Sequence, residues 1–459
     1  MLRKLYTTNI PNKTNKTSLT PVHIIVFSFI LIIISGTLLL KLPFSTVDGD
    51  ISILDALFTA TSATCVTGLV VYDTFTKFTF FGQLVIISMI QIGGLGLVTF
   101  TIFFSLIIGK HLGLGSLKIA GESANTSNFL QMKLLIKNIM KITFAFELTG
   151  AILFMIVFIP QFGAEGIWIS IFTSISAFCN AGFDIFGRLT EYTSLTTFAN
   201  NFYVLTITSI LIISGGLGFI VWTDIFNYKR TKKLLLHSKI VLIITVGLII
   251  LGGTVLSIIE WNNPNTLGNL SFIDKISNAF FQSISARTAG FNSIDLTQMS
   301  EVGKLMMSIL MFIGAAPGST GGGIKITTFA ILIFTVISVI KGKDETVILG
   351  RQINKKNVYR SHTIVTLAII VVFITSMVLL CDTPHQFTTM DYLFETISAF
   401  GTVGLSVGVV ALMGNIAKIM FVLTMFIGRV GPITFALFLA GKNANTKKEI
   451  LPDGDISIG

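Results

Sequence analysis

Four short segments of this 459-residue chain share one pattern, and each of them closes on a glycine followed by one apolar residue. They read DALFTATSATCVTGL at 55–69, ISIFTSISAFCNAGF at 169–183, NAFFQSISARTAGF at 278–291 and DYLFETISAFGTVGL at 391–405. A phenylalanine recurs near the start of each segment, Ser-Ala follows, and the closing glycines are Gly68, Gly182, Gly290 and Gly404. Because these glycines lie 114, 108 and 114 residues apart, the segments are copies of one internal repeat.

The backbone just before each closing glycine is the part of the repeat that could hold an ion. About ten helix-compatible residues precede it, too few to cross a bilayer, so each copy is expected to enter the membrane and turn back. Irregular backbone at that depth lines a watery cavity, and glycine allows it a positive φ. Four such loops of one orientation place carbonyl oxygens around one axis, where they can replace the hydration shell of a monovalent cation.

Four ordinary outer loops, whose glycines simply end helices, are the alternative interpretation of the repeat. The phenylalanine, Ser-Ala and glycine columns recur together in all four copies. That joint recurrence favours the re-entrant loops.

The composition places these loops in a membrane protein. Hydrophobic residues make up 52% of the chain and charged residues only 12%, against about 25% charged in soluble domains. The net charge of +10 does not predict a nucleic-acid partner, because a basic surface is diagnostic only where it faces water. The three cysteines are too few and too scattered for a disulfide framework or a metal cluster.

The basic residues predict which side of the membrane each segment faces. Five segments hold 23 of the 32 Lys and Arg but 7 of the 22 acids: 1–21, 110–141, 224–239, 341–360 and 441–459. The positive-inside tendency makes them, and both termini, cytoplasmic in a multi-pass plasma-membrane protein. Each stretch between them then crosses the membrane an even number of times, which fits two spans and an outer segment, or about eight spans in all. The four copies therefore point the same way, as parallel repeats.

This periodicity divides the chain into four repeats between two cytoplasmic ends. The predicted units are an N-terminal segment 1–21, repeat 1 at 22–109, repeat 2 at 110–228, repeat 3 at 229–342, repeat 4 at 343–441 and a tail 442–459.

Glycines also recur inside the second spans, at Gly93, Gly215, Gly314 and Gly428. Mid-span glycine weakens a helix, so a kink or a close backbone approach is expected, with small-residue helix packing as an open alternative for the first two. The third span cannot be a continuous helix, because ten residues in a row are Gly314, Ala315, Ala316, Pro317, Gly318, Ser319, Thr320, Gly321, Gly322 and Gly323. Such broken backbone predicts a cavity just inward of the closing glycines. A phosphate-binding loop is excluded, since no Gly-Lys pair is followed by Ser or Thr.

Charged residues inside predicted spans are further candidates for function. Arg429 sits at the centre of the last span, where a charge costs about 2.5–3.5 kcal/mol, so it should face the pore or a partner and oppose cation passage. Snorkelling to an interface is the alternative. Lys325 follows the glycine-rich loop and is either a gate element or an interface anchor. Glu147 is expected to have a structural partner, whereas for Arg287 an acidic partner and a direct effect on ions are both open.

Specific motifs resemble a known family. SAFGTVGL at 398–405, ARTAGF at 286–291, IQIGGLG at 90–96 and MFIGRVGP at 425–432 are similar to the membrane subunits, of the KtrB type, in the Ktr/Trk/HKT superfamily of potassium transporters. The resemblance runs from Thr20 to the C-terminus. It implies an all-α integral membrane fold with four parallel M1–P–M2 repeats, about eight transmembrane helices and four re-entrant pore helices around one central pore.

The resemblance also implies roles for particular residues. Potassium would bind filter carbonyls on four strands: Val66-Thr67-Gly68, Asn180-Ala181-Gly182, Thr288-Ala289-Gly290 and Thr402-Val403-Gly404. The loop at 314–323 would be an intramembrane gate, with Lys325 and Arg429 beside it. Only the fourth strand approaches the TVGYG of tetrameric channels, and Leu405 replaces its tyrosine, so a less regular filter is expected.

The resemblance finally implies how the protein is controlled. Sodium-stimulated potassium uptake by a homodimer, seated on a cytosolic KtrA-like ring, is expected. Potassium is the substrate, no cofactor is expected on this chain, and a nucleotide is expected on the partner subunit. A sodium-coupled solute carrier with broken helices is the alternative function, and a plain channel differs mainly in rate. An intramembrane enzyme is not predicted, because no histidine is followed by the glutamate of a zinc motif.

Overall fold

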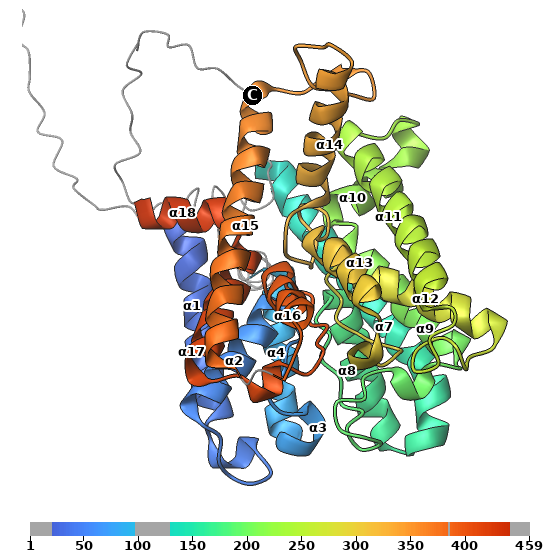
Figure 1. Ribbon diagram of the computed structural model, residues 1–459, viewed down its shortest axis with the longest axis vertical. Helices are drawn as coiled ribbons and strands as arrows, with labels where there is room; N and C mark the ends of the chain where they lie inside the picture. Colours follow the sequence, from blue (N-terminus) through green and yellow to red (C-terminus); the bar gives the residue numbers. More distant parts are fainter. Residues whose placement is uncertain (1–20, 97–128, 384–385, 441–459) are drawn as a thin grey trace, which may run out of the picture.

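The computed structural model describes residues 21–96, 129–383 and 386–440. The predicted end segments therefore lie outside the described residues, apart from the last residue of 1–21. In the described part nearly all regular structure is helical. One hairpin of two short strands, β1 (Val347–Ile348) and β2 (Arg351–Gln352), connects α14 (Ile326–Ile340) to α15 (Lys355–Asp382). The helices follow one order four times: a long helix, a short helix and a second span, which is interrupted in repeats 2, 3 and 4 (Figure 1).

The four first spans are long apolar helices. They are α1 (Pro21–Leu40), α7 (Phe129–Phe162), α11 (Leu236–Glu260) and α15 (Lys355–Asp382), and all four are long and apolar enough to cross a membrane. Many of their large apolar side chains are exposed, such as Leu31 at 64% and Ile258 at 73%. An exposed apolar surface of this kind is stable only against lipid.

The four short helices are the predicted pore helices. They are α2 (Ile53–Cys65), α8 (Glu165–Cys179), α12 (Phe272–Ser285) and α16 (Thr389–Gly401). Three of them begin at a side chain that caps the first turn, namely Ser52, Ser271 and Thr388, as helix starts prefer. Their C-terminal halves are buried. These four helices are too short to cross a membrane, as the re-entrant interpretation of the repeat requires.

The second spans are more broken than the sequence predicted in repeats 2 to 4, and in repeat 1 the described part ends at Gly96. They are α4 (Phe80–Leu95), α9 (Phe202–Gly216) with α10 (Phe219–Thr231), α13 (Glu301–Phe312) with α14 (Ile326–Ile340), and α17 (Asn415–Val430) with α18 (Pro432–Ala440). The α9–α10 pair bends by 93° and the α17–α18 pair by 102°. Gly218 and Gly431, with φ of 87° and 96°, make these bends. By length and composition the described helices therefore give four spans, or six if each bent pair is one span.

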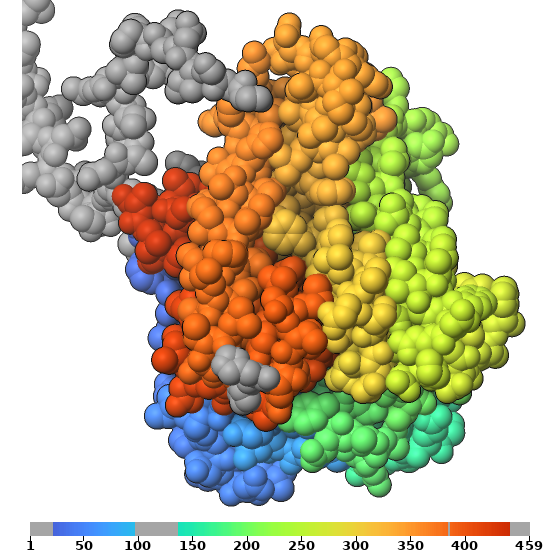
Figure 2. Space-filling model, viewed as in Figure 1, coloured from blue at the N-terminus to red at the C-terminus, as the bar shows by residue number. Residues whose placement is uncertain are grey.

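The repeats pack in a closed cycle. Each second span contacts the pore helix of the next repeat: α4 contacts α8, α9 contacts α12, α13 contacts α16, and α17 contacts α2. In Figure 2 the sequence colours form contiguous blocks on the visible face, because each repeat packs as a unit beside its neighbours. The predicted all-α fold of four M1–P–M2 repeats is confirmed. It brings the four pore helices together around one axis.

Candidate functional site

The four closing glycines form a ring, which we call the glycine ring. Their φ angles are all positive, at 92°, 69°, 80° and 96° for Gly68, Gly182, Gly290 and Gly404. A Cβ placed on any of them would lie 2.2–2.9 Å from a carbonyl oxygen of a neighbouring strand. Taken in chain order, these oxygens belong to Ala181, Ala289, Val403 and Thr67. Each strand therefore touches the next, the fourth returns to the first, and a side chain at any glycine would break the ring.

The backbone at the C-terminal end of each pore helix positions the strand that follows that helix. Val66, Asn180 and Thr402 end their helices in the left-handed conformation, with φ of 59°, 60° and 50°, and Thr288 has a φ of 72°. This reversal is a common way for a helix to end. It turns the chain sharply into the strand, where Thr67, Ala181, Ala289 and Val403 are fully buried.

The serine of each Ser-Ala pair holds its own strand. Ser62 and Ser398 accept hydrogen bonds from the amides of Gly68 and Gly404, each at 3.1 Å. In the other two copies the serine donates instead, Ser176 to the Phe183 carbonyl at 2.6 Å and Ser285 to the Phe291 carbonyl at 2.5 Å. The serine column thus has a structural reason, which the sequence pattern alone did not reveal.

The glycine-rich loop at 314–323 is closed at its base. The Gly314 amide donates to the Ile324 carbonyl at 2.8 Å, and Ile313 and Ile324 form a short parallel bridge. The loop is also tied to repeat 2, because the Ala316 amide donates to the Gly216 carbonyl at 3.1 Å. The break between α13 and α14 that the sequence predicted is confirmed by these contacts.

The loop lies directly against the residues that precede the glycine ring. A Cβ on Gly321 would come within 2.1 Å of the Thr288 hydroxyl oxygen, and one on Gly322 within 2.2 Å of the Thr402 hydroxyl oxygen. The Thr320 hydroxyl donates to the Phe178 carbonyl at 3.2 Å, at the end of the second pore helix. The loop backbone therefore covers the strands on the side of Thr288 and Thr402.

Arg429 connects this loop to repeat 1. Its guanidinium donates to the Thr320 carbonyl in the loop and to the carbonyls of Gly93 and Gly94, the last at 3.2 Å. Lys325 also contacts the loop, since its ammonium donates to the Gly321 carbonyl at 2.6 Å. In the described part of the chain no carboxylate forms an ion pair with either residue. Two positive charges thus lie beneath the glycine ring without a paired acid.

The second-span glycines allow a close backbone approach, including in the first two copies, where helix packing was the alternative. A Cβ on Gly93, Gly215 or Gly428 would lie within 2.0 Å of a carbonyl oxygen near the end of a pore helix. The oxygens belong to Thr64, Phe178 and Phe400. Only glycine fits at these points.

The remaining mid-span charges have different surroundings. Both carboxylate oxygens of Glu147 accept from the Gln91 amide, at 2.9 and 3.2 Å, which is the structural partner that was expected. Arg287 is 6% exposed, and among the described residues no acid forms an ion pair with it. The structural-pairing interpretation of Arg287 is therefore not supported.

A cavity of about 250 Å³ opens on the side of the ring away from the loop. We call it the vestibule. The four ring glycines line it, together with the carboxylates Asp73, Asp184 and Asp295. Sequence reasoning missed these acids, although each follows a ring glycine by two or five residues. Burial raises the pKa of Asp184 to about 7, and the nearby charge of Asp73 adds to this effect.

Comparison with known proteins agrees with this arrangement. The TrkH family, described as "Cation transport protein", matches residues 4–448. The potassium/sodium uptake protein NtpJ of Enterococcus hirae is 40% identical over 98% of this chain and its own whole length. The Ktr system potassium uptake protein B of Bacillus subtilis is 38% identical over 96% of this chain and 97% of the relative. The crystal structure of the potassium transporter TrkH from Vibrio parahaemolyticus shares the fold, with a TM-score of 0.70 at 18% identity, over 94% of this chain and 87% of that one. With its four-repeat fold and a family match over nearly its whole length, the chain belongs to the TrkH family of cation transport proteins.

Proposed function

We propose that this protein takes up potassium across the plasma membrane, and that the glycine ring is its selectivity filter. The observation that carries the proposal is the cyclic contact of four strands, each placing a carbonyl against the glycine of the next. Relatives at about 40% identity are named for potassium or potassium/sodium uptake. As a member of a cation transport family, the chain is not an enzyme.

The proposed path begins at the vestibule, which we place on the outer face of the membrane. Its three carboxylates raise the local concentration of cations, and carbonyls of the filter strands then replace the water around each ion. In this orientation both termini are cytoplasmic. The basic end of α10, with Lys229 and Arg230, and the connection to α11, with Lys232, also lie inside.

We propose that the loop at 314–323 is the gate. It covers the inner side of the strands, and Arg429 fastens it to repeat 1 through the Thr320 carbonyl. Lys325 and Arg429 add positive charge at this point, and in surroundings of low dielectric a positive charge opposes a passing cation strongly. Opening then requires the loop and the Arg429 guanidinium to separate.

Regulation is proposed to come from another chain. α10 ends at Thr231 and α11 begins at Leu236, and only residues 341–354 connect α14 to α15, so neither connection holds a folded domain. Relatives are named as parts of a Ktr system. We propose a homodimer on a cytosolic nucleotide-binding ring.

The purified chain alone is expected to bind no nucleotide tightly, because none of its Gly-Lys pairs continues as a phosphate-binding loop. Equilibrium dialysis with labelled ATP measures this directly. Micromolar binding of ATP to the membrane protein without any partner would contradict the proposal that the nucleotide binds only to the partner subunit.

Uptake of labelled potassium, by cells that lack other potassium uptake systems, tests the proposed function. Cells that express this chain with its regulatory partner should take up potassium when the medium contains it at micromolar to millimolar concentrations. Sodium in the medium should increase the rate of this uptake. No uptake above the empty cells, with the protein present in the membrane, would contradict potassium transport. Potassium uptake that is the same without sodium would contradict only the sodium effect.

Uptake should also depend on external pH through Asp184. Because its pKa is raised to about 7, the carboxylate is mostly ionised at pH 8 and mostly protonated at pH 6. One negative charge near the path is worth about 1 kcal/mol, so the apparent potassium affinity should fall about fivefold from pH 8 to pH 6. Asp184→Asn should behave at both values like the wild type at pH 6.

Asp50→Asn is the matched control for the pH experiment. Asp50 is exposed and lies before the first pore helix, and its hydrogen bond from Lys41 lowers its pKa, so it stays ionised at pH 6. This variant should keep the wild-type pH dependence. If Asp184→Asn keeps that dependence too, Asp184 is not the titrating group.

A further inference from the structure

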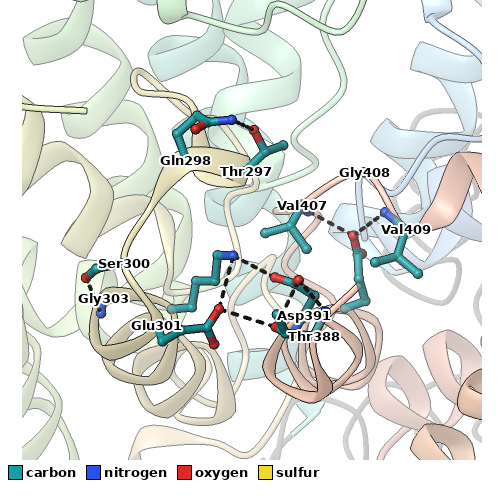
Figure 3. Close-up of polar contacts among 12 residues, drawn as sticks. Thr297, Gln298, Ser300, Glu301, Gly303, Thr388, Asp391, Val407, Gly408 and Val409 are labelled. Carbon is teal, nitrogen blue, oxygen red and sulfur yellow. Dashed lines mark hydrogen bonds and ion pairs between the residues drawn. The ribbon is translucent and has the colours of Figure 1, made fainter. Parts of the chain in front are cut away.

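A buried glutamate stands behind the fourth filter strand. Glu395 lies on α16 and is 0% exposed. One of its carboxylate oxygens, Oε1, accepts from the Ser406 hydroxyl at 2.6 Å and from the amides of Val407 and Val409 at 2.8 and 3.2 Å. Figure 3 shows the dashed lines from the Val407 and Val409 amides meeting on this one oxygen. All three donors belong to the segment just after Gly404.

These bonds are the main polar attachment of that segment to its pore helix. A hydrogen bond between buried groups stabilises the contact that it makes. The other oxygen, Oε2, is buried and has no partner among the described residues, which costs stability. Among the described residues, the hydrogen bonds of this carboxyl therefore all go to the segment after Gly404.

Glu395 and Ser398 hold the strand on both sides of its glycine. Residues three apart share one face of a helix, and Ser398 accepts from the Gly404 amide at 3.1 Å. Glu395 fixes residues 406–409 on the vestibule side, so Gly404 lies between two anchors on the same helix. Since Gly404 touches both neighbouring strands in the ring, its position affects their spacing as well.

The corresponding residues differ among the repeats. Each follows the phenylalanine of the repeat, and they are Thr59, Thr173, Gln282 and Glu395. The Gln282 amide also reaches the outer segment of its repeat, with a contact of 3.5 Å to the Ser293 hydroxyl. Thr59 instead donates to the Asp55 carbonyl in its own helix, at 2.9 Å. The long polar anchor is therefore a feature of repeats 3 and 4.

We propose that Glu395 is a positioning residue of the filter, which sets the preference for potassium over sodium by fixing the outer end of the fourth strand. Being fully buried, it acts through the backbone of residues 406–409 and never touches the ion. This inference rests on the proposed function, because it takes the glycine ring to be the filter.

Three substitutions separate the hydrogen bonds from charge and volume. Glu395→Ala and Glu395→Met both remove the acceptor, and methionine keeps most of the volume. Glu395→Gln keeps a neutral acceptor at the place of Oε1. Thr59→Ala is the matched control, because it changes the same column in repeat 1, where the side chain bonds only within its own helix.

The full chain in liposomes is assayed for labelled potassium uptake with sodium as competitor. Loss of the three hydrogen bonds should lower the ratio of the sodium inhibition constant to the potassium KM about tenfold in Glu395→Ala and Glu395→Met. Glu395→Gln should stay within about threefold of the wild-type ratio. Thr59→Ala should have the same ratio as the wild type. If alanine leaves the protein unfolded, the methionine variant decides.

A second readout does not require transport. Thermal unfolding of the purified protein, in potassium and in sodium, reports ion binding to the folded state. The wild type should be more stable in potassium, and the alanine and methionine variants should lose that difference. If they keep the wild-type ratio and the wild-type difference, or if glutamine is as impaired as alanine, the positioning role is wrong. A wild type with neither uptake nor stabilisation by potassium would instead contradict the proposed function.

Discussion

Gly290→Ser is expected to lower the apparent potassium affinity or the preference over sodium by about a hundredfold. Gly290 has a φ of 80°, which a serine adopts only with strain, and a Cβ there would lie 2.3 Å from the Val403 carbonyl oxygen. That oxygen must move, and it belongs to the next filter strand. Serine at Gly68, Gly182 or Gly404 should act in the same direction, because a Cβ there comes within 2.9 Å of a neighbouring carbonyl oxygen.

Gly49→Ser is the control for the ring variants. Gly49 also has a positive φ, of 74°, but a Cβ there would meet only the Pro43 carbonyl oxygen at 3.8 Å. It carries the same kind of backbone strain without a filter strand beside it. Potassium competition against sodium, measured in liposomes, should distinguish the two positions. Unchanged affinity and unchanged sodium exclusion in all four ring variants would show that the ring is not the filter.

Opening the gate by mutation should raise flux about tenfold or more. A unit charge about 4 Å from the path opposes a cation by about 4 kcal/mol at an effective dielectric of 20, so Arg429→Ala should speed uptake. Deletion of residues 318–322 removes both Thr320 and the glycines that contact Thr288 and Thr402, and it should speed uptake too. Selectivity should persist in both, because the filter strands are unchanged.

The double variant tests whether the loop and Arg429 act together. The guanidinium donates to the Thr320 carbonyl, and groups in direct contact show non-additive effects. The double variant should therefore be little faster than the faster single variant. Arg230→Ala, an exposed arginine at the end of α10, should leave the rate unchanged. If the deletion leaves uptake unchanged, or abolishes it in folded protein, the loop is scaffold.

The sequence predicted the parts of the site that depend on spacing along the chain. The period of the repeat predicted four pore helices and one glycine at the same place in each, and the run from Gly314 to Gly323 predicted a broken span. These features are local, so a single sequence contains them. The position of Arg429 at mid-span predicted that it would face a partner or the pore, for the same reason.

Contacts between distant residues could not be predicted in this way. Arg429 bonds to Gly93 and Gly94, which lie more than 300 positions earlier in the chain. The vestibule acids come from three repeats, and only the fold brings Asp73, Asp184 and Asp295 to one cavity. The sharp bends at Gly218 and Gly431 likewise depend on how α10 and α18 pack against the rest of the fold.

Anomalous diffraction from crystals of the full chain in rubidium tests the central claim most directly, because rubidium replaces potassium and scatters anomalously. The account predicts rubidium peaks on the axis of the glycine ring, within coordination distance of carbonyl oxygens from the four strands, and no such peaks in crystals grown in sodium. Well-ordered strands with no rubidium at the ring, or rubidium bound only elsewhere in the membrane region, would contradict it.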